Sequence, residues 1–225
     1  MTKIPAWLAL LCAAALAACA GDTDTGADDA ITVGFSQVGA ESEWRTANTR
    51  SIQESLAAPE FRLKFSDGQQ KQENQIKALR SFIAQRVDVI AFSPVVETGW
   101  ESVLQEAKAA GIPVVLTDRA VNVSDPSLYV TLIGSDFVEE GRRAARWLIE
   151  DSAGRTGPIR VVELQGTVGS APANDRAQGF REVIGEDARF EIVRTQSGDF
   201  TRAKGKEVME AFIKAEGQNP IDVLY

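Results

Sequence analysis

The chain has 225 residues, 44% of them hydrophobic, and a net charge of −8, so it can bury a sizeable core. Histidine is absent, which excludes the His-dependent forms of serine, cysteine and zinc catalysis. The acidic balance and the lack of a Lys/Arg cluster argue against a nucleic-acid partner. We expect neither a metal site nor a cofactor.

Residues 1–18 have the anatomy of a secretory leader. Lys3 precedes an apolar stretch at 7–16 that is too short to span a bilayer, and small residues stand before Cys19. This resembles a bacterial lipoprotein signal, in which Cys19 becomes the lipidated first residue of the mature chain. An ordinary secretory signal cut after an Ala is the alternative. Cys12 and Cys19 are the only cysteines, so no disulfide framework is expected in the mature domain.

Residues 19–30 combine four Asp residues with Gly, Thr and Ala. Such a composition cannot bury a core, and we expect a flexible acidic tether. The predicted location is the periplasm or cell envelope, with a lipid anchor at Cys19.

From residue 31, short runs rich in Val and Ile alternate with helical periodicity. The strands predicted for the first run are 31–36, 61–65, 87–92, 114–117 and 128–133. The helices predicted between them are 42–56, 72–85 and one that carries Trp100 to Ala107 and ends before Gly111. On the first helix, Trp44, Ala47, Ile52 and Leu56 fall roughly on one face.

The pattern restarts after the junction at 134–136. Predicted helices at 137–150, 173–184 and 201–215 alternate with predicted strands at 159–164, 190–194 and 222–224. Two runs of β-α units predict two lobes, 31–134 and 135–225, each an α/β doubly wound parallel sheet flanked by helices. Because the chain stops on a predicted buried strand, we interpret the second lobe as incomplete and the chain as C-terminally truncated.

Ligands of open parallel sheets bind beyond the carboxyl ends of the strands. The segments expected there are polar, planar and charged, with aromatic neighbours: 37–45, 67–70, 93–94, 118–119, 165–166 and 197–199. Hydrogen-bonding groups beside aromatic rings suit a sugar, which has hydroxyls on its edges and C–H faces. The glycine-bearing segment 166–169 lacks the Lys and the spacing of a phosphate-binding loop, and we interpret it as a tight turn.

Five segments carry a resemblance to a known family: GFSQVG at 34–39, DGQQKQENQ at 67–75, Asp118-Arg119, VELQGTVG at 162–169 and SGDFTRAKGKEVME at 197–210. They resemble the ribose/galactose-type periplasmic sugar-binding proteins of ABC importers, most of all the galactofuranose-binding type, over residues 31–225. The resemblance implies a type I periplasmic binding fold, in which a two-lobed clamp closes on one monosaccharide and presents the closed form to a membrane permease.

Carried over position by position, the resemblance implies sugar contacts from Glu41, Trp44, Arg45, Asp118 and Arg119 in the first lobe and from Arg176 in the second. Each residue has a structural alternative. Trp44 would be a core residue of its helix, Glu41 and Arg45 an exposed i,i+4 pair, and Arg176 a solvated helix residue. Asp118 and Arg119 follow a buried strand and must find partners or a ligand.

We therefore predict a monomeric, non-enzymatic solute-binding component of an ABC sugar importer, which captures galactofuranose or a related pentose or hexose. A sugar sensor that docks on a chemoreceptor or receptor kinase is the alternative. A repressor effector domain would need an N-terminal helix-turn-helix, where this chain has a leader. A secreted enzyme using Asp118 or Glu163 as a carboxylate base is a further alternative.

Overall fold

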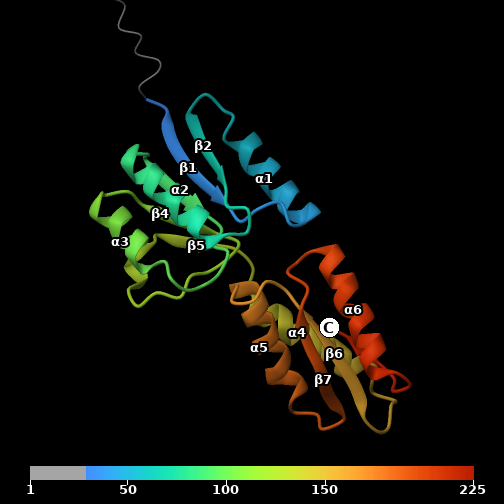
Figure 1. The fold of residues 1–225 in the computed structure, drawn as a ribbon. Coiled ribbons are helices and arrows are strands. Elements are labelled where there is room, and N and C mark those ends of the chain that lie inside the picture. Colours follow the sequence, from blue (N-terminus) through green and yellow to red (C-terminus); the bar gives the residue numbers. More distant parts are fainter. Residues whose placement is uncertain (1–28) are drawn as a thin grey trace, which may run out of the picture. The chain divides into compact units, whose positions relative to one another are not determined.

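A computed structural model describes residues 29–225, which include a compact unit from Ile31 to Tyr225. The strands of this unit form two parallel sheets, one of five strands and one of three (Figure 1). Between residues 29 and 225, no helix combines the length and apolar character needed to cross a membrane. The predicted leader, Cys19 and nearly all of the predicted tether lie outside the described residues.

The five-stranded sheet has the strand order β2-β1-β3-β4-β5. Its strands are β1 Ile31–Gln37, β2 Phe61–Asp67, β3 Val89–Phe92, β4 Val114–Thr117 and β5 Thr131–Ile133. All neighbouring pairs are parallel, so the five carboxyl ends lie along one edge. The order changes direction at β1, which makes the end of this strand a preferred place for a ligand.

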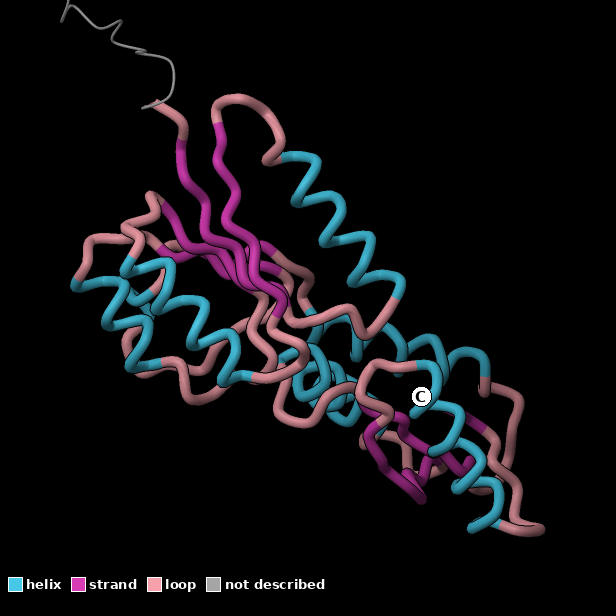
Figure 2. The backbone as a smooth tube through the Cα atoms, turned by 45° about the horizontal axis from the view of Figure 1, so that its top comes forward, coloured by secondary structure: helices cyan, strands magenta, loops and turns pink. Residues whose placement is uncertain are grey.

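Helices α2 (Gln72–Ala84) and α3 (Glu101–Ala109) cover one face of this sheet, and α1 (Glu43–Ser55) lies on the other (Figures 1 and 2). The core under α2 and α3 is built from fully buried apolar side chains, among them Leu79, Ile90, Phe92, Trp100, Leu104 and Leu116. We call β1–β5 with α1–α3 the first lobe.

The three-stranded sheet has the order β7-β6-β8, with strands β6 Ile159–Gln165, β7 Phe190–Ser197 and β8 Val223–Leu224. Helices α4 (Phe137–Asp151) and α5 (Ala171–Ile184) pack on one face, where Phe180 and Val161 are buried. Helix α6 (Arg202–Glu216) packs on the other face through Val208 and Phe212. We call these elements the second lobe.

The predicted architecture of doubly wound parallel sheets is confirmed, and most predicted elements differ from the observed ones by at most three residues at either end. The segment 166–169 forms the predicted turn, in which Ser170 N donates to the Thr167 carbonyl at 3.1 Å. The boundary between residues 134 and 135 stays a prediction.

The predicted apolar face of the first helix is wrong as a core face. Arg45 is the buried residue of α1, whereas the Trp44 side chain is 57% exposed. Ser42 caps α1 by accepting a hydrogen bond from Arg45 N at 3.1 Å, which fixes the first turn so that Arg45 points inward.

The predicted strand 128–133 is also too long. Residues Pro126–Leu128 form a short 3₁₀ helix, because the Asp125 side chain accepts a hydrogen bond from Ser127 N at 2.9 Å and Pro126 favours a helical start. Leu128 is nevertheless buried in the first core, and β5 begins only at Thr131.

Two glycines let α4 and α5 approach each other closely. A Cβ atom at Gly141 would lie 2.2 Å from the Arg176 carbonyl oxygen, and one at Gly179 would lie 1.9 Å from the Val138 carbonyl oxygen. Both distances are far below van der Waals contact with backbone atoms, so a side chain at either position must push the helices apart. The pair α4–α5 is therefore held in one arrangement by backbone contact.

We expect Gly179→Ala to lower the free energy of unfolding by about 1–3 kcal/mol, because the added methyl group overpacks the contact between α4 and α5. Urea denaturation followed by circular dichroism measures the change. The matched control is Gly154→Ala, where a Cβ atom would meet nothing within 4 Å. Equal stability of the two variants would contradict the assigned helix contact.

Candidate functional site

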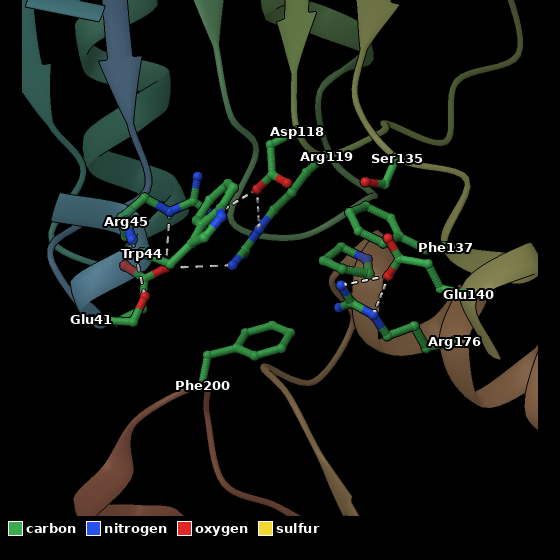
Figure 3. A pocket seen from close by; sticks show the side chains of 12 residues that line it. Glu41, Trp44, Arg45, Asp118, Arg119, Ser135, Phe137, Glu140, Arg176 and Phe200 are labelled. Atoms are coloured by element: carbon green, nitrogen blue, oxygen red, sulfur yellow. Dashed lines mark hydrogen bonds and ion pairs between the residues drawn. The ribbon is translucent and has the colours of Figure 1, made fainter. Parts of the chain in front are cut away.

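A pocket of about 330 Å³ opens where loops from the carboxyl ends of β1, β4, β5, β6 and β7 come together. We call it the main pocket (Figure 3). It is lined by Glu41, Ser42, Trp44, Arg45, Asp118, Arg119, Ser135, Phe137, Glu140, Pro172, Arg176 and Phe200. All six predicted sugar contacts line the main pocket, from both lobes.

Four charged side chains of the first lobe form one ion-pair network: Glu41, Arg45, Asp118 and Arg119 (Figure 3). Arg45 Nε donates to Glu41 Oε1 at 3.0 Å, and Arg45 Nη2 donates to Asp118 Oδ2 at 2.7 Å. Arg119 Nη2 lies 3.5 Å from Glu41 Oε1, and Arg119 Nη1 donates to the Val95 carbonyl at 3.2 Å. Two carboxylates and two guanidinium groups cancel in formal charge.

This network is buried. The side chains of Glu41, Arg45 and Arg119 are each 2% exposed, which rules out an exposed i,i+4 pair for the first two. Burial, followed by the nearby positive charge of Arg45, lowers the pKa of Arg119 to about 10. Arg119 therefore still carries its charge at neutral pH, although the surroundings oppose it.

Within the part of the chain that the structure describes, three polar atoms of the network have no hydrogen-bond partner: Glu41 Oε2, Arg45 Nη1 and Arg119 Nε. Each is buried and belongs to a charged side chain that lines the main pocket. A buried polar atom without a partner is unfavourable by about 1–3 kcal/mol, and by more on a charged group. One acceptor and two donors of the network are therefore left without a hydrogen bond beside the main pocket.

Aromatic rings line the same pocket. Trp44 lies beside Arg45, whose guanidinium carbon is 4.8 Å from the indole centroid. Phe200, from the loop after β7, lies under Arg119 with a corresponding distance of 5.3 Å. Trp44 is thus neither a core residue nor an isolated surface residue, because its ring borders a polar pocket.

The local backbone conformation determines where the Phe200 ring lies. Asp199 and Phe200 both have left-handed conformations, with φ of 51° and 57°. The ring occupies the space beside Gly166, where a Cβ atom would lie 1.9 Å from Phe200 Cζ. Gly166 is therefore required for this ring position.

Arg176 makes its contacts inside the second lobe. Its Nε and Nη2 both lie 2.9 Å from Glu140 Oε2, and its guanidinium carbon lies 4.4 Å from the Phe137 ring centroid (Figure 3). The Arg176 side chain is 37% exposed, so it is half-buried at the pocket rather than on a fully solvated face.

Six lining residues were not among the predicted contacts: Ser42, Ser135, Phe137, Glu140, Pro172 and Phe200. Phe137 and Glu140 lie in the first turn of α4, which follows the end of β5. The rule that ligands bind beyond the carboxyl ends of parallel strands could therefore have included them. Phe200 directly follows the polar segment 197–199 and was equally within reach of that rule.

Two parallel α/β lobes whose strand-end loops line one polar pocket are typical of proteins that bind a small ligand. The chain belongs to the periplasmic binding protein domain family, whose model matches residues 33–225.

The chain is similar to several sugar-binding proteins. The galactofuranose-binding protein YtfQ of Escherichia coli (strain K12) is 56% identical over 186 residues, which cover 83% of this chain and 58% of YtfQ. A solved protein from Mycobacterium smegmatis, in complex with β-D-fucofuranose, is 57% identical with a TM-score of 0.83, covering 87% of this chain and 64% of that one.

The periplasmic binding protein component of the arabinose ABC transporter from Shewanella sp. ANA-3 was solved with α- and β-L-arabinofuranose. It is 55% identical with a TM-score of 0.81, covering 86% of this chain and 63% of that one. This chain thus spans less than two thirds of the length of each of these three proteins.

We expect Asp118→Asn to lower the free energy of unfolding by about 3 kcal/mol, because it leaves two buried arginines facing one carboxylate. Asn tolerates the left-handed backbone of Asp118, whose φ is 64°, so the charge alone changes. Urea denaturation provides the measurement.

The matched control is Glu43→Gln, which removes an exposed ion pair with Arg202 and should change stability by less than about 1 kcal/mol. If both variants lose the same small amount, the network at Asp118 is not held together by its charges.

Proposed function

We propose that this protein is the solute-binding component of an ABC sugar importer. It captures one neutral monosaccharide in furanose form in the main pocket and delivers it to a membrane permease, without a catalytic step of its own. It acts as a monomer, with its two lobes meeting near the boundary between residues 134 and 135.

The observation that carries this proposal is a set of three buried atoms that lack a hydrogen-bond partner and belong to side chains lining the main pocket. Glu41 Oε2 needs a donor, while Arg45 Nη1 and Arg119 Nε need acceptors. A sugar hydroxyl both donates and accepts, so neighbouring hydroxyls of one ring can serve all three atoms. Hydrogen bonds to charged groups are the stronger kind, which suits tight binding of a molecule that water also solvates well.

Charge and shape favour the same ligand class. The four network charges cancel, and Arg176 is paired with Glu140, so the site has no surplus charge to neutralise a phosphate or carboxylate. The pocket volume of about 330 Å³ lies at the small end of ligand pockets, which span about 300–1,000 Å³. The Trp44 ring offers an apolar surface to the C–H face of a sugar.

The relatives support the furanose form and the transport role. Two proteins that are 57% and 55% identical to this chain were solved with β-D-fucofuranose and with L-arabinofuranose, and a third is named for galactofuranose. The Shewanella relative is a component of an ABC transporter, which favours an importer over a sensor that docks on a chemoreceptor or receptor kinase.

We propose further that the protein works in the periplasm or cell envelope, held by a lipid on Cys19. The support is the sequence: an apolar leader followed by small residues precedes Cys19, and an acidic tether follows it. The tether would let the folded unit reach both its ligand and a permease.

We expect Arg119→Met to weaken sugar binding by about 2–5 kcal/mol, because it removes a charged partner from a desolvated site while keeping an apolar stem beside Phe200. Calorimetric titration of the purified protein with D-galactose, D-fucose and L-arabinose measures the loss. Arg119→Lys keeps the charge but loses the planar fork of donors, and should fall between the wild type and Arg119→Met.

Arg80→Met is the control, since Arg80 forms an exposed ion pair with Glu106 and lies outside the main pocket. A folded Arg119→Met protein with an unchanged dissociation constant would refute Arg119 as a ligand contact. A wild-type protein that binds none of the three sugars would refute the proposed function itself.

We expect Cys19→Ala to move the protein from the membrane fraction to the soluble fraction, because the residue that would carry the lipid is lost. Cell fractionation and mass spectrometry of the mature N-terminus test this. The control is Cys12→Ala, which lies within the leader and should leave the protein on the membrane. Wild-type protein that is already soluble and lacks lipid would overturn the anchor.

A further inference from the structure

A second, smaller pocket of about 160 Å³ adjoins the main pocket within the second lobe. We call it the inner pocket. It shares Pro172, Arg176 and Phe200 with the main pocket, so these three residues form a common wall. Glu163, from β6, lines the inner pocket and not the main pocket. To contact Glu163, a molecule in the main pocket must therefore extend into the inner pocket.

Glu163 is a buried carboxylate with an unused acceptor. The residue is 1% exposed. Its Oε2 accepts hydrogen bonds from Arg181 Nη2 and from Thr195 Oγ1, the latter at 2.8 Å. Its Oε1 is buried and has no hydrogen-bond partner among residues 29–225. A hydrogen-bond donor at Oε1 would remove the free-energy penalty of a buried, charged oxygen that lacks a hydrogen bond.

The other groups around the inner pocket do not supply that donor. The hydroxyl of Tyr225 donates to the Arg176 carbonyl at 3.0 Å, and the Arg176 guanidinium is paired with Glu140. Ala173 and Ala177 are buried and apolar. The inner pocket thus has mostly apolar walls, and its polar side chains are the Glu163 carboxylate, the Arg176 guanidinium, the Gln165 amide and the Tyr225 hydroxyl. Such a lining suits a short carbon chain that ends in a hydroxyl.

We propose that the inner pocket receives the exocyclic chain of the furanose held in the main pocket, and that Glu163 Oε1 accepts a hydrogen bond from the terminal hydroxyl of a two-carbon chain. This inference rests on the proposed function and narrows it to hexofuranoses with a free hydroxyl on C6. Because Glu163 lies beyond the shared wall, the outermost hydroxyl is the group that reaches it.

The sugars bound by the relatives form a series that tests this proposal. L-Arabinofuranose, D-fucofuranose and D-galactofuranose share the same ring configuration. Their exocyclic groups are CH₂OH, CH(OH)CH₃ and CH(OH)CH₂OH, respectively. D-Fucose therefore lacks only the C6 hydroxyl of D-galactose, and L-arabinose lacks the whole C6 carbon. The proportion of furanose differs among the free sugars, but it cancels when a variant is compared with the wild type for each sugar.

The experiment is calorimetric titration of wild type and Glu163→Leu with D-galactose, D-fucose and L-arabinose. Leu has a similar size but an apolar side chain, so the variant removes the acceptor without opening a cavity. We expect the affinity for D-galactose to fall about tenfold or more, the effect of losing a hydrogen bond to a charged group, and the other two affinities to change less than about threefold. Thr195→Val, which removes a partner of Oε2 only, is the matched control and should leave the ratios unchanged.

Ala177→Val provides a test that leaves Glu163 in place. The added methyl groups narrow the inner pocket, so binding of D-galactose and D-fucose should weaken relative to L-arabinose. This variant decides the question if Glu163→Leu does not fold, as judged by circular dichroism. Equal effects on the three sugars, or none, in a folded variant would overturn the role of the inner pocket. A wild-type protein that binds none of the three sugars would instead overturn the proposed function.

Discussion

The structure of the site depends on one largely buried ion-pair network, formed by the charged side chains of Glu41, Arg45, Asp118 and Arg119. Each charge alone would be strongly unfavourable there, and their burial is tolerated only because every one of them forms an ion pair with an opposite charge within 3.7 Å. The loops that carry them must therefore be fixed closely. The left-handed backbone of Asp118 illustrates the constraint, because a Cβ atom at Gly134 would lie 2.8 Å from the Asp118 carbonyl oxygen. The ends of β4 and β5 can meet only with a glycine at that position.

Buried amides, rather than apolar packing, hold the remaining loops of the first lobe. Helix α1 buries Arg45, so little apolar surface attaches its first turns to the sheet. Instead, the fully buried Gln37 donates from Nε2 to Asn48 Oδ1 and Thr49 Oγ1, both at 3.0 Å. The equally buried Gln75 donates to the Ser93 carbonyl at 2.7 Å and to the Gln37 carbonyl at 3.2 Å. Polar groups at the carboxyl ends of β1 and β3 thus position one another, while the side chains of the network line the main pocket.

The sequence predicts best those elements that a repeated pattern of apolar residues marks. Runs of Val and Ile locate the strands, and the strand-end rule together with the family resemblance brings Asp118 and Arg119 to the pocket. The prediction fails where a single side-chain contact decides the outcome. Periodicity placed Trp44 with the apolar residues of its helix, but the cap at Ser42 and the ion pairs of Arg45 turn the neighbouring residue inward. Hydropathy likewise extended β5 back to Leu128, which is buried from a 3₁₀ turn. These outcomes depend on individual side-chain contacts, which are local at Ser42 and Asp125 and long-range between Arg45 and Asp118. Periodicity records none of them.

Phe200 is a further case in which a single side chain decides the outcome, and it marks a difference between the two lobes. Each lobe has an equivalent turn after its first edge strand: Gly68-Gln69-Gln70 after β2 and Gly198-Asp199-Phe200 after β7. In both turns the second and third residues are left-handed, and the glycine nitrogen donates to the carbonyl of a glutamine, Gln37 or Gln165, at the end of the neighbouring strand, β1 or β6. The backbone is thus repeated, and only the third side chain differs. The first lobe places a glutamine there, whereas the second places an aromatic ring that reaches Arg119 and forms part of the wall between the two pockets. One substitution on a shared turn is therefore enough to give the second lobe its contact with the charged network of the first.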